Sequence, residues 1–343
     1  MIMRFADFFN FFTQDIAMDL GTANTLLYTK KHGIVLNEPT VVALESTTGK
    51  VLAVGAEAKK YQGRTPNNLH TVRPLKEGVI ADFDITTKLI EYFVRKVLGT
   101  VRFLKPRFVI CVPMGITMVE KKAVIDSALL GGAREVRLIE EPMAAAIGAG
   151  LNVHAPTGHF VLDIGGGTSE CAVVALDGIV VSKSIRVAGD VLDLTVQRYI
   201  RDVFRMEVGI TTAEKVKISL GQACAEDDDA TLEIAGKDVV QGVPRIIVLR
   251  AGDLREALGD TIRLIADIVL ETLELTPPEL SADILEQGLF LAGGGSLLNG
   301  MDRLLAKETG LFVHMDVDPL LTVIKGTGCA MQDIKEYKHV FIN

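Results

Sequence analysis

Apolar residues recur along the chain in two patterns, as short β-prone runs and as longer stretches with helical spacing. In residues 84–98, five apolar side chains fall on one helical face: Leu89, Ile90, Phe93, Val94 and Val97. Comparable helices are predicted over 117–130, 191–204 and 253–273, and short buried strands over 16–20, 108–112, 160–164 and 288–292. Strands that alternate with helices in this way are typical of an α/β fold.

The stretch 160–174 (FVLDIGGGTSECAVV) carries the strongest chemical signal. Two apolar runs flank a glycine triplet, which predicts a hairpin whose turn can lie against a ligand because glycine has no Cβ. Backbone N–H groups in such a turn bind anions, and Asp163 and Thr168 add a carboxylate and a hydroxyl. This pattern indicates phosphate and Mg²⁺ binding; taken alone, it also fits an ordinary glycine-rich hairpin with a capping Asp.

A second copy of this pattern lies near the N-terminus. Residues 16–28 (IAMDLGTANTLLY) repeat strand, Asp, apolar residue, Gly, small polar loop and strand, with Asp19 placed 144 residues before Asp163. Two such hairpins that face each other across a cleft would hold a polyphosphate, with the two carboxylates sharing one metal ion through water. The chain has no G-x-x-x-x-G-K-[ST] motif, so the P-loop fold is set aside.

Residues 136–148 place two carboxylates between a predicted strand and a predicted helix. Glu140 and Glu141 precede Pro142, which suits the first turn of a helix. A carboxylate beside a phosphate cleft can orient or deprotonate the water that attacks a γ-phosphate. The alternative is a solvated Glu that the helix dipole favours near an N-terminus. The helix itself is rich in Ala and Gly, so we expect it to pack closely as a connector between two lobes.

The second half of the chain offers further polar candidates. Thr211 and Glu214 have the spacing of a capping box, and Glu214 and Lys217 share one face of the predicted helix that follows. This pair fits either a surface ion pair or polar groups that reach a ribose.

A strand, a glycine turn over 293–296 and a helix over 297–309 form a third place where backbone can close on a nucleotide. We expect Leu297, Met301, Leu304 and Leu305 to face inward on that helix. Gly326 and Gly328 are expected to precede a last helix.

Composition narrows the function classes. A length of 343 residues favours two domains, and an apolar content of 48% is typical of a globular protein. The net charge of −8 does not favour binding to nucleic acid, which is itself negatively charged. The four cysteines lie far apart and fit buried small hydrophobes in a reducing compartment, and no histidine spacing indicates zinc. The uncharged stretch 142–162 contains prolines, glycines and histidines, so no membrane-spanning helix is predicted.

Two segments have the character of membrane-surface anchors. On a helical wheel one apolar face of residues 1–12 gathers Ile2, Phe5, Phe9 and Phe12. The loop 99–106 offers Val101, Phe103 and Leu104 between basic residues, which suits an anionic membrane surface. A terminal segment packed on its own domain and a loop folded onto the adjacent helix are the alternatives.

These stretches together resemble the actin/Hsp70/sugar-kinase superfamily and, within it, the rod-shape-determining bacterial actins. The resemblance covers the chain from Asp15 onward and is carried by 19–28 (DLGTANTLLY), 36–44 (LNEPTVVAL), 78–83 (GVIADF), 141–150 (EPMAAAIGAG), 163–168 (DIGGGT) and 241–245 (QGVPR). Ala188 and Leu194 depart from the family pattern, where a glycine and an acidic residue are usual.

The resemblance implies two duplicated ribonuclease-H-like domains, each with a smaller subdomain, around a cleft for ATP and Mg²⁺. The expected organisation is a membrane-binding segment 1–14, domain I over 15–145 with an insertion at about 33–77, domain II over 146–315 with an insertion at about 188–250, and a return to domain I over 316–343. It further implies slow ATP hydrolysis coupled to assembly into homopolymer filaments. These filaments would be cytoplasmic, lie on the inner face of the cell membrane and act with cell-wall elongation proteins.

Carried over by position, the resemblance also implies roles for individual residues. Glu141 and Thr168 would position the hydrolytic water, and Asp19 and Asp163 would hold Mg²⁺ through water. Phosphates and Mg²⁺ would be held by Asp19, Gly21, Thr22, Asn24, Asp163, Gly165, Gly166 and Gly167, and further nucleotide contacts would come from Ala23, Thr168 and Asp190. Glu214 and Lys217 would meet the ribose and base, and Gly293, Gly294, Gly295 and Ser296 would flank the adenine.

Two other classes share this fold. A soluble sugar-type kinase would need a base Asp for a sugar hydroxyl and usually a longer chain. An Hsp70-type chaperone would need a substrate domain that 343 residues cannot hold.

Overall fold

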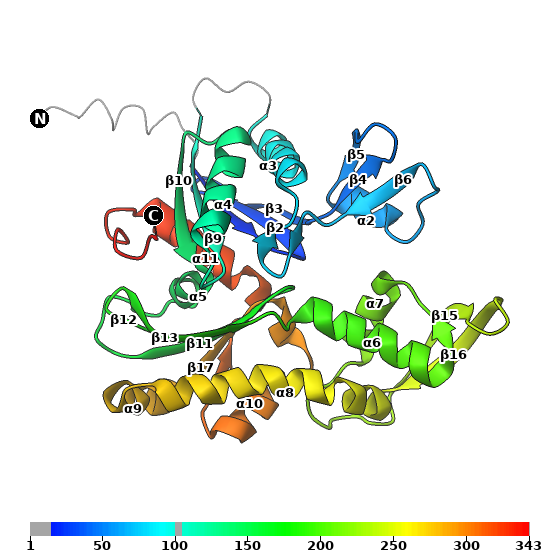
Figure 1. Cartoon of the computed structure of the whole chain (residues 1–343). Helices are drawn as coiled ribbons and strands as arrows, with labels where there is room; N and C mark the ends of the chain where they lie inside the picture. Colours follow the sequence, from blue (N-terminus) through cyan, green and yellow to red (C-terminus); the bar gives the residue numbers. More distant parts are fainter. Residues whose placement is uncertain (1–14, 100–104, 343) are drawn as a thin grey trace, which may run out of the picture. The chain divides into compact units, whose positions relative to one another are not determined.

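The computed structural model describes residues 15–99 and 105–342 of the chain (Figure 1). The predicted anchor residues Ile2, Phe5, Phe9, Phe12, Val101, Phe103 and Leu104 lie outside the described residues. The chain divides into two compact units, and each is described by itself. Unit 1 comprises 1–157, 174–180 and 320–343, and unit 2 comprises 158–173 and 181–319.

Unit 1 is built on a five-stranded mixed sheet. Its order is β10 (Glu135–Glu140), β9 (Arg107–Val112), β1 (Ile16–Leu20), β2 (Asn24–Thr29) and β3 (Gly33–Pro39). β10, β9 and β1 are parallel, whereas β1, β2 and β3 form an antiparallel meander. Alternation along β1 sends Ile16, Met18 and Leu20 into the core with α3 (Phe83–Leu98) and α4 (Met118–Leu130), so Asp19 points to the opposite face.

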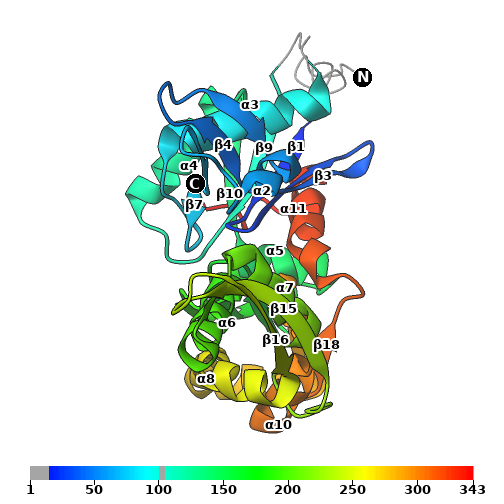
Figure 2. The ribbon, with the colours of Figure 1, turned by 90° about the vertical axis from the view of Figure 1, so that its right-hand side faces the viewer.

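That opposite face is covered by α11 (Thr322–Gln332), which packs on β1 and β9, and by α5 (Glu141–Gly148) (Figure 2). A smaller part of the unit contains β4 (Val42–Glu45), β5 (Val51–Val54), β6 (Leu69–Val72) and α2 (Ala56–Tyr61), and a short hairpin pairs β7 (Leu75–Lys76) with β8 (Val79–Ile80). An insertion was expected over about 33–77, but β3 pairs with β2 in the main sheet. The separate small sheet therefore begins with β4.

Unit 2 repeats this arrangement. Its main sheet has the order β13 (Gly178–Ile185), β12 (Ser169–Ala175), β11 (His159–Ile164), β17 (Leu289–Ala292) and β18 (Val313–Met315). Phe160, Leu162 and Ile164 of β11 enter the core, so Asp163 points to the other face, as Asp19 does in unit 1. The helices are α6 (Gly189–Phe204), α7 (Ile210–Leu220), α8 (Ala251–Leu275), α9 (Pro278–Gln287) and α10 (Met301–Thr309), and a second sheet joins β14 (Met206–Glu207), β15 (Thr231–Asp238) and β16 (Pro244–Arg250).

Three helix boundaries differ from the expectations. α7 begins at Ile210 after an extended Gly209 with no side-chain cap, so Thr211 lies inside the helix and the predicted capping box is wrong. α10 begins only at Met301, because a 3₁₀ turn over Gly294–Leu297 and the left-handed Gly300 come first, and Leu297 is exposed rather than inward. Gly326 and Gly328 lie within α11 instead of preceding it.

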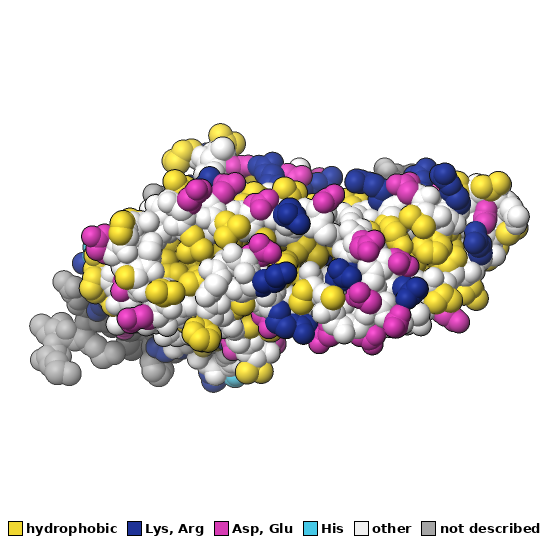
Figure 3. Space-filling model, turned by 90° about the horizontal axis from the view of Figure 1, so that it is seen from below, with side chains coloured by type: hydrophobic (Ala, Val, Ile, Leu, Met, Phe, Trp, Pro, Cys, Tyr) yellow, Lys and Arg dark blue, Asp and Glu magenta, His cyan; other side chains and the backbone are white. Residues whose placement is uncertain are grey.

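The surface and the helices can be compared with the expectations about charge and membrane-spanning segments. Figure 3 shows a face on which acidic and basic side chains are interspersed between apolar patches. Among the helices of residues 15–99 and 105–342, none has the length and apolar character that a membrane span requires.

The cysteines only partly follow the expectation from sequence. Cys111 and Cys171 are buried as expected, but Cys224 is half-buried and Cys329 is exposed, so the expectation of four buried cysteines is wrong for these two.

Candidate functional site

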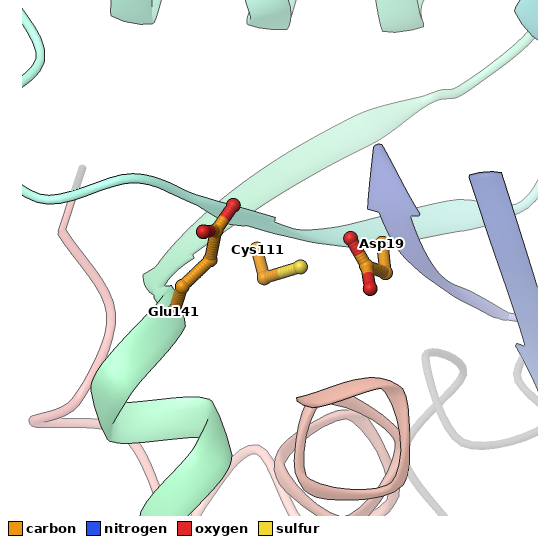
Figure 4. Close-up of side chains that lie close together, drawn as sticks. All are labelled: Asp19, Cys111 and Glu141. Carbon is orange, nitrogen blue, oxygen red and sulfur yellow. The ribbon is translucent and has the colours of Figure 1, made fainter. Parts of the chain in front are cut away.

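In unit 1, three side chains from three elements meet at the carboxyl ends of the parallel strands. Asp19 of β1 pairs in register with Cys111 of β9, and Glu141 opens α5 directly after β10. Ligand-type atoms of these three residues all lie within 4.8 Å of one another, and Figure 4 shows Cys111 between the two carboxylates. The structure thus brings Asp19 and Glu141 together, as the resemblance implied.

The electrostatics of this cluster follow from burial. Burial raises the pKa of Asp19 to about 6, and a hydrogen bond from Cys111 opposes that rise. Burial and the two neighbouring carboxylates hold the pKa of the Cys111 thiol well above its usual range. The thiol therefore stays protonated, and its Sγ–H also reaches the Met18 carbonyl at 3.6 Å. Because the Cys111 thiol is neutral, it adds no third negative charge between the carboxyl groups of Asp19 and Glu141.

The turn between β1 and β2 is tight and internally bonded. A Cβ on Gly21 would lie 2.7 Å from the Asn24 carbonyl oxygen, so only glycine fits there. Thr40 donates its hydroxyl to the Gly21 carbonyl at 2.7 Å, and the buried Thr22 hydroxyl accepts the Gly78 N–H at 2.9 Å. Thr22 therefore also ties the turn to the β7–β8 hairpin, while Ala23 and Asn24 remain partly exposed.

The glycine turn of unit 2 is held by the start of α6. The Gly165 N–H donates to Thr168 at 2.9 Å, which closes the turn. The carbonyls of Gly165 and Gly166 accept the N–H groups of Gly189 at 3.2 Å and Asp190 at 2.8 Å. Because these carbonyls are bonded toward α6, the turn has a fixed conformation. The departures from the family pattern, the buried Ala188 and the exposed Leu194, do not interrupt these bonds.

A second glycine turn presses against the strand that carries Asp163. Gly293 has a φ of +80°, and a Cβ there would lie 2.3 Å from the Asp163 Oδ1 atom. A Cβ on Gly295 would lie 2.3 Å from the Ile164 side chain, and Ser296 donates its hydroxyl to the Ala292 carbonyl at 2.5 Å. The sequence predicted a turn at 293–296; the structure adds the reason for its glycines, which is contact with β11 rather than space for a ligand alone.

Lys217 joins this group through Asp193, a residue that the sequence analysis did not single out. The Lys217 Nζ atom lies 2.8 Å from Asp193 Oδ1 and donates to the Gly189 carbonyl at 3.0 Å. Both side chains are largely buried, so the exposed surface pair considered from sequence does not describe Lys217. No local pattern on α6 indicated Asp193, because its partner Lys217 comes from α7.

Each unit therefore carries its own set of the predicted site residues. Unit 1 carries Asp19, Gly21, Thr22, Ala23, Asn24 and Glu141, and unit 2 carries Asp163, Gly165 to Thr168, Asp190, Glu214, Lys217 and Gly293 to Ser296. Sequence reasoning missed Cys111, Asp193 and Thr40 as members of these sites. Carboxylates and glycine turns in this arrangement are suited to a phosphate group with a hard cation.

Two repeated α/β units with a glycine turn on the first hairpin of each sheet define the actin-like class of folds. The MamK double helical filament structure matches with a TM-score of 0.77 over 93% of this chain and 99% of that chain, at 19% identity, which supports the fold alone. MreB5 of Spiroplasma citri bound to ADP matches with a TM-score of 0.90 at 35% identity, over 94% of this chain and 98% of that one.

The chain belongs to the MreB/Mbl protein family, whose model matches residues 13–339. It is 47% identical to the cell shape-determining protein MreB of Escherichia coli (strain K12) over 94% of each chain. It is 45% identical to the cell shape-determining protein Mbl of Bacillus subtilis (strain 168), over 94% of this chain and 97% of that protein. The bacterial-actin expectation is confirmed, and these findings do not support the soluble sugar-kinase alternative.

Proposed function

We propose that this bacterial actin binds and slowly hydrolyses ATP, polymerises into membrane-associated filaments and organises cell-wall synthesis to maintain rod cell shape. The observation that carries the proposal is the duplicated Asp-apolar-Gly hairpin, in which Asp19 and Asp163 each point away from the main core of their unit. The relatives support it, because they are named cell shape-determining proteins and the S. citri structures hold ADP and AMPPNP.

For the nucleotide, we propose that both hairpin turns contact one Mg-ATP. Backbone N–H groups in glycine turns of this kind suit phosphate oxygens. Burial disfavours the negative charge of Asp19 and raises its pKa to about 6. A nearby cation would stabilise that charge, so Asp19 fits the hydration shell of a Mg²⁺ ion. Bound Mg²⁺ would neutralise charge on the phosphates.

For hydrolysis, we propose that Glu141 orients the attacking water and that Thr168 assists from the other turn. Glu141 is the first residue of α5, and a helix N-terminus favours a nearby negative charge. Its partial exposure leaves it accessible to water, while the Cys111 thiol beside it is buried and protonated. A carboxyl group that is accessible to water is the feature that a water-orienting group requires.

For membrane attachment, we propose that residues 1–12 and the loop 99–104 act together on the inner face of the cell membrane. The described residues that follow the two segments in the chain meet at the amino-terminal ends of β1 and β9, where the Arg107 N–H donates to Asp15 at 3.2 Å. Arg134 lies 3.9 Å from Asp15, and Lys105 is exposed. Basic side chains at these strand ends suit anionic lipid headgroups.

The test is to incubate the purified chain with ATP, ADP or no nucleotide, with and without anionic liposomes. Sedimentation, electron microscopy and phosphate release are then measured, with a sugar-phosphorylation assay in parallel. We expect ATP-dependent polymers on the liposomes and phosphate release without any acceptor. Phosphate transfer to a sugar without polymer would overturn the proposal in favour of a kinase.

A further inference from the structure

One buried ion pair in unit 2 connects the residues assigned to the two ends of the nucleotide. Asp193 is 5% exposed, and its carboxylate lies 2.8 Å from the Lys217 Nζ atom. Asp193 lies in the second turn of α6 and Lys217 in the last turn of α7, so the pair joins two helices that pack together. A buried charge of this kind requires its partner, because either charge alone would be costly to desolvate.

The pair continues into the phosphate turn through a short series of hydrogen bonds. Lys217 also donates to the Gly189 carbonyl at 3.0 Å. The Gly189 N–H donates in turn to the Gly165 carbonyl at 3.2 Å, and the adjacent Asp190 N–H donates to Gly166 at 2.8 Å. The position of the ammonium group is therefore transmitted to the start of α6 and to the glycine turn that α6 holds.

The groups in this connection surround Gly189. A Cβ on Gly189 would lie 3.4 Å from the Gly165 carbonyl oxygen and 3.5 Å from Lys217 Nζ, which is ordinary van der Waals contact. Burial raises the pKa of Asp193, Lys217 lowers it, and the carboxylates of Glu214 and Asp190 add to the rise. Lys217 is thus the cation paired with Asp193, and two further carboxylates lie close enough to act on that pair.

We infer that Asp193 is a positioning residue for the nucleotide: it fixes Lys217, and through Lys217 and Gly189 it couples the nucleoside side of the site to the phosphate turn. This inference rests on the proposed nucleotide function. Asp193 itself is buried behind Lys217 and contacts no ligand in this role. Its substitution should therefore alter how tightly the nucleotide binds more than how fast the bound nucleotide reacts.

The test uses Asp193→Asn, Lys217→Met and the double variant, with Asp202→Asn on the exposed face of the same helix as control. Binding of Mg-ATP and Mg-ADP is measured by calorimetry, and KM and kcat by phosphate release. We expect Asp193→Asn to weaken binding and raise KM about tenfold, with kcat changed less than threefold, as for loss of a charge-assisted contact. Asp202→Asn should behave as the parent protein.

The double variant separates positioning from a general structural effect. If Asp193 acts through Lys217, the double variant should bind nucleotide no more weakly than Lys217→Met alone. Additive losses, or parent-like KM in Asp193→Asn, would overturn the inference. If Asp193→Asn does not fold, the comparison of the double variant with Lys217→Met still decides. Failure of the parent protein to bind ATP would instead overturn the proposed function.

Discussion

Gly326 of α11 lies against Ala144 of α5 so closely that a Cβ on Gly326 would be 1.8 Å from the Ala144 carbonyl oxygen. The contact is reciprocal, because a Cβ on Gly148 of α5 would lie 1.9 Å from the Thr322 carbonyl oxygen. The two helices therefore meet backbone to backbone. Since α5 begins at Glu141, this contact also fixes the helix that carries the proposed water-orienting carboxylate.

The first prediction concerns this helix contact. Gly326→Ala should lower the free energy of unfolding by about 3 kcal/mol, because the added methyl meets backbone that cannot turn aside. Urea denaturation measures the change. Gly259→Ala is the matched control, since Gly259 is exposed inside α8 with nothing within 4 Å of an added Cβ. In Gly259→Ala the free energy of unfolding should rise by up to about 1 kcal/mol, because alanine has the higher helix propensity. Equal losses of stability in both variants would refute the packing argument.

Gly326 and Gly328 also show what could not be predicted from the sequence. A local pattern places Gly326 and Gly328 before a helix, because glycine usually interrupts helices. Their actual role is set by partners far away in sequence, Ala144 and Tyr28. In contrast, the hairpins around Asp19 and Asp163 could be predicted, because strand, glycine turn and strand are adjacent in the chain.

The second prediction follows from the pKa of Asp19. An acid whose folded-state pKa is raised from 3.8 to about 6 favours the folded state at low pH and loses that contribution as pH rises through 6. At about 1.4 kcal/mol per pH unit, the loss reaches about 3 kcal/mol by pH 8. Nucleotide-free Asp19→Asn should therefore lose less stability than the parent protein between pH 4 and 8. Denaturant unfolding across this range measures the difference, and parallel profiles would contradict it.

The third prediction tests the contact between Gly293 and Asp163 of β11 in unit 2. Gly293→Ala places a methyl 2.3 Å from Asp163 Oδ1, so it should displace this carboxylate and weaken Mg-ATP binding about as much as Asp163→Ala does. Gly310→Ala is the control, because Gly310 has a φ of +73° but nothing within 4 Å of an added Cβ. Both variants share the backbone strain of a positive φ. Equal calorimetric affinities for the two variants would show that strain alone matters.

Side chains that reach a site from a neighbouring element could not be predicted either. Cys111 enters the unit 1 site because β9 runs parallel to β1 with Cys111 opposite Asp19, a register that no local pattern specifies. Asp193 enters the unit 2 site because α7 brings Lys217 to it. Glu141 could be placed at a helix start from sequence, since the strand and the helix on either side are contiguous.

The fourth prediction concerns hydrolysis. Glu141→Gln keeps the size of the side chain but removes its charge, so ATP binding should persist while phosphate release slows tenfold or more. Binding is measured by calorimetry and hydrolysis by single-turnover phosphate release. Glu140→Gln serves as the control, because Glu140 ends β10 beside the site but lies outside the Asp19–Cys111–Glu141 cluster. Unchanged hydrolysis in Glu141→Gln would remove this residue from the mechanism.

The fifth prediction separates the two proposed membrane segments. Deleting residues 1–12 should reduce co-sedimentation with anionic liposomes, because burial of a few apolar side chains per copy gives only marginal binding that a polymer multiplies. The decrease should be larger when polymerisation is prevented by omitting ATP, since a polymer can still use many copies of the loop. Val101→Ser/Phe103→Ser in the full-length chain is the complementary variant. Undiminished binding of the deletion together with loss in the loop variant would assign attachment to residues 99–104 instead.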